Sequence, residues 1–226
     1  MPDSSHSDHR YLQPGEFVNS DDPDVVAFAR ETTESASGDV DRARALFYRI
    51  RDDILYDPYL PLGRRSSYTA VDCLNNGRGW CVPKAALLAA CARVIGIPAR
   101  CGYADVRNHL ATQKLLDAIG TDIFYWHSYC DLYLNGGWVK ATPAFNKSLC
   151  DRFHLKPLEF DGLNDSLFHE FDQSGNRHME YLHYRGTYAD VPFTEIVDTF
   201  RDKYTGLAAH LREGIDGDFQ AEAGSY

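Results

Sequence analysis

Apolar residues recur along this chain with the spacings of helices and strands. Over residues 40–56 they recur every three or four positions, which predicts a helix, and Asp22-Pro23 opens an earlier helix as its cap and first position. A nearly continuous apolar run covers residues 85–95 and stops at Gly96-Ile97-Pro98, a typical helix end. The first hundred residues therefore predict three helices.

The second half of the chain has the alternation and the turn residues of a sheet. Residues 99–106 and 124–134 have strand patterns, and residues 138–142 return as a hairpin partner after Asn135-Gly136-Gly137. Short helices are predicted over 108–119 and from Asp190 to about Tyr204. Residues 143–190 show no clear period, which favours loops that cover a site. We predict an α+β fold with an antiparallel sheet.

The length of 226 residues indicates one domain with a substantial core. We assign this domain to residues 21–207, with a flexible N-terminal arm over 1–20 and a C-terminal tail over 208–226. Motion is expected to concentrate in the arm and after about Gly206, because chain ends are ordered only where contacts hold them.

Composition excludes several classes of function. The 33 acidic and 23 basic side chains give a net charge of −10, which argues against sequence-independent binding of nucleic acid. We see no secretory signal and no apolar window of about 18 residues, so no membrane partner is expected. The six cysteines contain no CxxC pair, which predicts reduced thiols and a cytoplasmic location. Nothing in the sequence indicates the oligomeric state.

Cys81 is the strongest candidate for chemistry. It follows a glycine-rich turn and directly precedes the apolar helix, with Pro83 in the first turn, where helix N–H groups have no partner. Free N–H groups and the positive helix end favour a thiolate, so we expect the pKa of Cys81 to be lowered. We also expect the glycines, Gly77 and Gly79, to let a substrate backbone approach the sulfur.

His127 is the candidate general base for this thiol. Simple alternation along strand 124–134 places it with Tyr125 and Tyr129 on one face, and places Phe124 and Trp126 on the other. A histidine beside a cysteine at a helix start is the usual activator of a thiol in acyl chemistry.

These motifs together resemble the bacterial transglutaminase-like superfamily, whose core is related to papain-like cysteine proteases. The resemblance covers about residues 68–146, and it rests on the order and spacing of five segments: Gly79-Trp80-Cys81, Gly96-Ile97-Pro98-Ala99-Arg100, Gly102-Tyr103, His127 and Trp138-Val139-Lys140-Ala141-Thr142-Pro143. It implies a Cys-His-Asp triad. It also implies a cysteine-proteinase fold, with the nucleophile at the N-terminus of a central helix that packs on an antiparallel sheet.

The sequence departs from this family at the third member of the triad. Thr142 stands where the superfamily usually has aspartate before the proline. With Gly136-Gly137 as a two-residue turn, Asn146 would lie opposite His127. Thr142 comes opposite if the turn centres near Leu134-Asn135, or if a bulge brings it there. We prefer Thr142 and keep Asn146 as the alternative.

Other polar residues carry weaker signals. His169, His178 and His183 lie among acidic residues, but the five-residue spacing of the last two shares neither a helix face nor a strand face, so we expect no metal and no cofactor. A basic group, Arg64, Arg65, Arg78 and Lys84, flanks the cysteine. It would hold an acidic substrate group, support the thiolate or lie at the surface.

The sequence predicts an enzyme that attacks a peptide or small amide substrate through Cys81 and forms a thioester. Release to water, as in a peptidase or amidase, is preferred over release to an amine, as in a transglutaminase. Trp80 would form a wall of the acyl site, and the Cys81 N–H, with help from near Trp80, would stabilise the oxyanion. The alternatives are a degenerate binding module and an unrelated structural or metal-binding protein.

Overall fold

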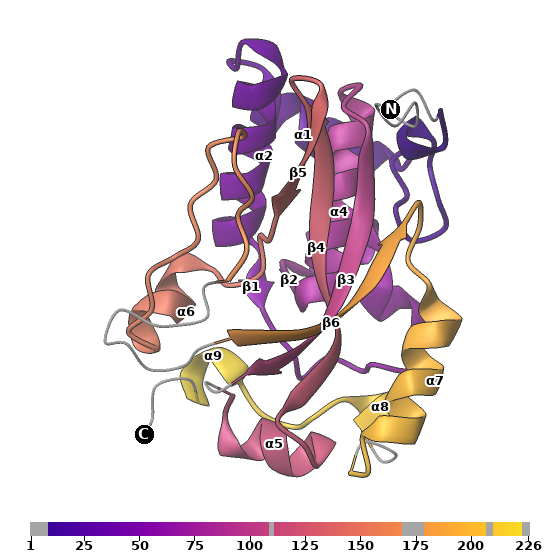
Figure 1. Ribbon diagram of the computed structural model, residues 1–226, viewed down its shortest axis with the longest axis vertical. Helices are drawn as coiled ribbons and strands as arrows, with labels where there is room; N and C mark the ends of the chain where they lie inside the picture. The colour runs from indigo at the N-terminus through magenta and orange to yellow at the C-terminus, as the bar shows by residue number, and fades with distance from the viewer. Residues whose placement is uncertain (1–8, 109–110, 169–178, 207–209, 223–226) are drawn as a thin grey trace.

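The computed structural model describes residues 9–108, 111–168, 179–206 and 210–222 (Figure 1). The helices are η2 (His9–Leu12), α1 (Pro23–Thr33), α2 (Gly38–Asp53), η3 (Arg65–Tyr68), α3 (Ala70–Asn76), α4 (Cys81–Val94), α5 (Gln113–Ile119), α6 (Lys147–Arg152), α7 (Phe193–Lys203), α8 (His210–Glu213) and α9 (Phe219–Glu222). The strands are β1 (Leu55–Tyr56), β2 (Arg78–Gly79), β3 (Ala99–Asn108), β4 (Ile123–Leu134), β5 (Gly137–Ala141) and β6 (Met179–Tyr188).

A four-stranded antiparallel sheet in the order β5-β4-β3-β6 forms the centre of the fold. It contains all three predicted strands and confirms the α+β class. Strands β1 and β2 form a separate short parallel pair. The predicted helix over 108–119 begins later, at Gln113, because β3 continues to Asn108 and the Thr112 side chain caps α5 by accepting the Leu115 N–H.

Helix α4 is the core element that the apolar run predicted. Every residue from Cys81 to Arg93 is buried, so the helix has no polar face. It lies against β3 and β4 on one side, with α1, α2 and α3 packed around it (Figure 1). The start of this helix, and with it Cys81, is therefore fixed by packing on all sides.

The β4–β5 hairpin turns at Asn135-Gly136, because Leu134 pairs with Gly137. Both turn residues have positive φ, 49° and 85°, as a two-residue hairpin turn requires. This turn differs from both predicted turns, at Gly136-Gly137 and near Leu134-Asn135. The last pair is Cys130 with Ala141, so β5 ends before it reaches His127.

A bulge in β4 changes the faces that simple alternation predicted. Ala104 pairs with His127 and Val106 pairs with Phe124, so two residues of β4 lie opposite Asp105 alone. Trp126 takes φ 61°, and its N–H donates to the Asp105 carboxylate at 3.1 Å. Phe124 and His127 consequently share a face, although alternation had separated them.

Strand β6 lies in the segment that the sequence predicted to be irregular. Its pairing with β3 shifts register twice, at Arg185 and at Leu182, and these shifts break the period of two. It lies at the end of the strand order beside β3, and much of it is exposed, so it lacks the apolar alternation of a buried strand.

The described residues 9–20 are packed against the rest of the fold, and the expected flexibility of the arm over 1–20 stays a prediction. Arg93 donates to the Gln13 carbonyl at 2.6 Å, and the Asp190 carboxylate accepts the N–H groups of Glu16 and Val18 at 2.7 and 2.9 Å. Val18 is fully buried. Residues 1–8 lie outside the described part of the chain.

Candidate active site

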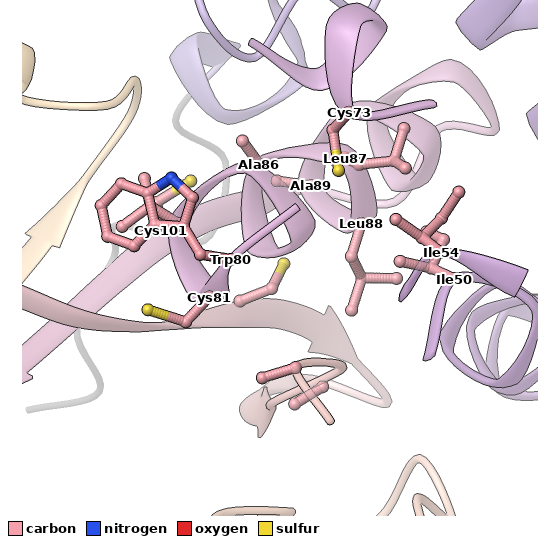
Figure 2. Packing of buried hydrophobic residues seen from close by; sticks show 14 of the residues in the cluster. Ile50, Ile54, Cys73, Trp80, Cys81, Ala86, Leu87, Leu88, Ala89 and Cys101 are labelled. Carbon is pink, nitrogen blue, oxygen red and sulfur yellow. The ribbon is translucent and has the colours of Figure 1, made fainter. Parts of the chain in front are cut away.

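Cys81 is the first residue of α4, as the sequence predicted, and follows Trp80 as the N-cap residue. In Figure 2, the Cys81 sulfur and the Trp80 ring project to one side of the helix start, away from Leu88 and Ile54. Gly79, just before them, has a packing role, and the predicted role of the glycines in admitting a substrate backbone stays a prediction. A Cβ on Gly79 would lie 2.6 Å from the Cys73 sulfur.

Cys81 and His127 line the same cavity, whose volume is about 40 Å³. Both side chains are nearly buried, with 6% of Cys81 and 5% of His127 exposed. The other lining residues are Tyr56, Pro58, Leu62, Trp80, Val106, Asn108, Leu115, Ile119, Phe124, Tyr125, Phe145, Met179, Phe200 and Tyr204. The fold thus brings the predicted nucleophile and base to one small, largely apolar space.

Burial raises the pKa of the Cys81 thiol to about 12, which reverses the lowered pKa that its helix position predicted. Backbone N–H groups of Ser128, Val82 and Cys81 itself favour the thiolate, but desolvation in the cavity outweighs them. The Ser128 contribution had no signal in the sequence. It arises because β5 leaves β4 after Ala141, so β5 does not cover the backbone there.

The aromatic rings of Phe168 and Tyr181 flank the His127 imidazole, with centroids 5.7 and 6.5 Å away. Phe168 precedes the undescribed residues 169–178, and Tyr181 lies on β6. The imidazole is therefore enclosed by one ring from Phe168 and one from β6. Asp131, also on β4, pairs with Arg100 at 3.0 Å and not with His127.

Asn146 does not orient His127 in this structure. Its Oδ1 accepts the Tyr56 N–H at 2.9 Å, and its Nδ2 donates to Ser148 at 2.7 Å. A reciprocal pair of amide bonds, each 3.3 Å, joins it to Gln220. These four bonds use the full capacity of the amide, so its role is to tie β1 and α9 together.

Thr142 is buried beyond the end of β5, where its N–H donates to the Ser166 carbonyl at 3.1 Å. Its hydroxyl has no hydrogen-bond partner among the described residues. The hydrogen bond to His127 that we expected is thus absent from this structure, and the role of Thr142 as the orienting residue stays a prediction.

Trp80 forms a wall of the cavity, where the sequence placed it. Its indole N–H donates to the Ser67 carbonyl at 3.1 Å, and its ring meets Tyr68 edge-on at 5.2 Å. The indole N–H is therefore committed to η3, so any oxyanion donor near Trp80 is a backbone group.

Three of the four flanking basic residues, Arg65, Arg78 and Lys84, have structural partners. Arg65 pairs with Glu16, and Arg78 pairs with Asp57 at 3.0 Å. Lys84 is fully buried and donates to the carbonyls of Arg51 and Ile54 at the C-terminal end of α2. Burial lowers the pKa of Lys84 to about 7. Lys84 therefore neither holds a substrate group, supports the thiolate nor lies at the surface. Its ammonium group binds backbone carbonyls that the end of α2 leaves without partners.

Residues 210–222 pack against residues next to the cavity, and the expected looseness of the tail over 208–226 stays a prediction. The Ile215 N–H donates to the Tyr59 carbonyl at 2.8 Å, and Gln220 donates to the Tyr56 carbonyl at 2.7 Å. The Phe219 ring packs on Tyr56 at 5.8 Å, and Tyr56 lines the cavity. Figure 1 shows α9 beside β1. Residues 207–209 and 223–226 lie outside the described part.

Among the described residues, no group of three or more metal-ligating side chains is close enough to hold an ion. His169 and His178, from the histidine cluster of the sequence, lie outside the described ranges. Helices long and apolar enough to cross a membrane are likewise absent from the part of the chain that the structure describes.

The fold is similar to that of several solved structures. A "putative cysteine protease" from Cytophaga hutchinsonii is 18% identical, with TM-score 0.51 over 86% of this chain and 50% of that chain. A second similar structure is a "putative protease" from Parabacteroides distasonis, with 15% identity and TM-score 0.39 over 60% of this chain and 25% of that chain. A third is the periplasmic domain of TgpA from Pseudomonas aeruginosa, with 21% identity and TM-score 0.41 over 59% of this chain and 45% of that chain. The chain spans half or less of the length of each.

The family model of the transglutaminase-like superfamily matches residues 26–143, which is more than half of the chain. This match runs from α1 through β5 and includes both cavity residues, Cys81 and His127. No curated protein matches the chain. On the family match and on the fold, this chain belongs to the transglutaminase-like superfamily.

Proposed function

We propose that the protein is a cysteine-dependent acyl-transfer enzyme that hydrolyses an amide bond in a peptide or small amide. The observation that supports this proposal is the meeting of Cys81 and His127 in one cavity within a transglutaminase-like fold. Cys81 is the nucleophile and His127 the general base.

The raised pKa of Cys81 determines the form of the first step. A thiol with a pKa of about 12 is neutral at rest, so His127 removes the proton as the sulfur attacks the carbonyl carbon. The C–N bond then breaks, and the imidazolium returns the proton to the departing amine. The product is a thioester on Cys81, and a water deprotonated by His127 hydrolyses it to the free acid.

Backbone N–H groups stabilise the negative charge that develops during the reaction. Those of Ser128, Val82 and Cys81 already favour negative charge on the sulfur. Once the sulfur is bonded to the carbonyl carbon in the tetrahedral intermediate, the negative charge lies on the oxygen, and the Cys81 N–H at the helix start is available to this oxyanion. We assign this role to the backbone because the Trp80 indole is bonded to Ser67.

Hydrolysis is preferred over transfer to an amine. Transfer requires a second site that binds an amine, whereas hydrolysis requires only water, and the cavity of about 40 Å³ is sufficient for water. The six free cysteines support a reducing, cytoplasmic location as part of this proposal.

A binding module without turnover is the second candidate. The observation that favours it is the third triad position, because Thr142 is neutral and Asn146 is saturated by other partners. Without a carboxylate, an imidazolium at His127 is stabilised less.

Acylation by p-nitrophenyl acetate tests the enzyme against the binding module. The enzyme gives a burst of p-nitrophenol and an acetylated Cys81 peptide, and both are lost in Cys81→Ser and strongly reduced in His127→Gln. Cys73→Ser is the matched control, since Cys73 is also buried, lies beside the glycine turn, and should not affect the burst. Absence of acylated Cys81 in the folded wild type would support the binding module. Added hydroxylamine separates transfer from hydrolysis by its concentration dependence, because an amine-binding site gives a rate of hydroxamate formation that saturates, whereas direct attack on an open thioester rises linearly.

A further inference from the structure

The wall of the Cys81 cavity is apolar well beyond the two reactive residues. Its lining includes Leu115 and Ile119 of α5, Phe124 of β4, Phe200 of α7 and Tyr204 just after α7. No Asp, Glu, Lys or Arg lines the cavity within the described part of the chain. A charged substrate group placed there would lose its hydration without gaining a counter-charge.

The size of the cavity limits what enters. Its volume is about 40 Å³. So small a space favours a short acyl group over an extended one. A long or bulky acyl group would require the aromatic side chains to move.

We propose that this cavity is the acyl pocket of the site and selects a short, uncharged, apolar acyl group. The bulge at Trp126 produces this pocket, because it turns Phe124 onto the face of His127. Phe124 then sets the depth of the pocket and is its specificity-determining residue. The proposal rests on the proposed function, since it takes Cys81 as the acylated residue.

The electrostatics of the surroundings support an uncharged group. Nearby basic side chains are directed to other partners: Arg78 to Asp57, and Lys84 to the end of α2. The chain as a whole carries a net charge of −10. An acidic acyl group would therefore meet neither a local cation nor a favourable net field.

Modification of Cys81 by methanethiosulfonates tests charge selection without an ester substrate. The probes are the neutral methyl and propyl reagents, the anionic 2-sulfonatoethyl reagent and the cationic 2-(trimethylammonio)ethyl reagent. Each rate on Cys81, mapped by mass spectrometry, is divided by the rate on a free thiol of the same reagent. We expect the neutral reagents to exceed both charged ones by at least about tenfold, because only they enter without losing hydration. Equal normalised rates would overturn the proposal.

Chain length tests the pocket size, with hexyl methanethiosulfonate as the long probe. We expect the hexyl reagent to react at least about tenfold more slowly than the propyl reagent in the wild type, and Phe124→Ala to remove most of this difference. Phe28→Ala is the matched control, because Phe28 is also partly buried but lies on α1, away from the cavity. If the two variants behave alike, Phe124 does not set the depth. The wild-type comparison of propyl and hexyl reagents stands even if a variant fails to fold.

The two proposals fail separately. Selection for short neutral reagents with no acylation by p-nitrophenyl acetate would retain the pocket and reject the enzyme. A burst with acetylated Cys81 but no preference among the methanethiosulfonates would retain the enzyme and reject the pocket.

Discussion

The titration of Cys81 is the sharpest quantitative expectation from this structure. Its pKa is raised from 9.0 to about 12, so the thiolate fraction at neutral pH falls by about three powers of ten relative to an ordinary cysteine. A more basic thiolate is also a better nucleophile, with a Brønsted coefficient of about 0.4–0.5, which restores roughly 15- to 30-fold. Alkylation of Cys81 should therefore be about 30- to 60-fold slower than that of a free thiol, before any effect of access.

The assay is alkylation by iodoacetamide between pH 6 and pH 11, with each cysteine mapped by mass spectrometry. Slow access of the reagent to Cys81 lowers its alkylation rate by the same factor at every pH. The informative quantity is therefore the pH at which the rate inflects. We expect the Cys81 rate to keep rising with pH up to pH 11. In denaturant, all six cysteines should show the ordinary inflection, which controls for the chemistry of the reagent.

An inflection of Cys81 below pH 8 in the folded protein would refute the reasoning. It would mean that the helix N-terminus, the three N–H groups and His127 together outweigh desolvation. A thiolate–imidazolium pair would then exist at rest, and the general-base step proposed above would be unnecessary.

Three further predictions follow from buried polar groups. Because the folded pKa of Lys84 is about 7 and the unfolded one 10.5, the unfolded chain holds an extra proton at Lys84 between these values, which adds at most about 1.4 kcal/mol of stability per pH unit from 7 to 9. The six buried cysteines have raised pKa values and act in the opposite direction as the unfolded thiols ionise, so the Lys84 effect is the difference in stability between the wild type and Lys84→Met. This difference, measured from urea midpoints at pH 7, 8 and 9, should change with pH in favour of the wild type, and a constant difference would contradict the prediction. Thr142→Val should leave stability in urea unfolding unchanged or raise it by up to about 1 kcal/mol, since the lost hydroxyl has no hydrogen-bond partner among the described residues. Thr142→Asp should lower the pH at which the alkylation rate of Cys81 inflects, if its carboxylate reaches His127. Destabilisation by Thr142→Val would show that the hydroxyl is bonded. Gln220→Ala removes the bonds to Tyr56 and Asn146 and should weaken protection of residues 210–222 in hydrogen exchange by about 1–3 kcal/mol, with Gln113→Ala, at an exposed site, as the control. Unchanged exchange would mean that Phe219 holds α9 without the amide bonds.

Local signals in the sequence were sufficient for the central elements. The nearly continuous apolar run after Cys81 predicted a helix, and the predicted fold made it the central helix packed on the sheet; its burial on every side is a finding of the structure. The turn at Asn135-Gly136 lies within the predicted Asn-Gly-Gly segment, although the choice between its possible centres required the pairing itself. The placement of Cys81 and His127 on one cavity follows from these two elements.

What the sequence did not predict depends on tertiary contacts. The helix position of Cys81 indicates a lowered pKa, but desolvation comes from residues as distant as Met179 and Phe200, which the chain brings to the cavity only when folded. The bulge at Trp126 depends on Asp105, which accepts its N–H, and on Arg185, which pairs with that carboxylate at 2.9 Å. Neither Asp105 nor Arg185 lies within residues 124–134, so the pattern of that segment could not predict the bulge.

The pairing of β3 with β6 also affects the order in which the chain can fold. β3 meets β4 after a short connection, whereas β6 is separated from it by α5, β4, β5 and α6. Closing that long loop is slow, so this pairing is expected to form after the β3–β4–β5 meander. A chain still emerging from the ribosome would have Cys81 and His127 before it has Met179 or the Asp190 carboxylate that holds residues 16–18. The nucleophile is thus enclosed only after the chain has been synthesised as far as Tyr204, the last residue of the cavity lining, and until then its apolar surroundings would be open to chaperones.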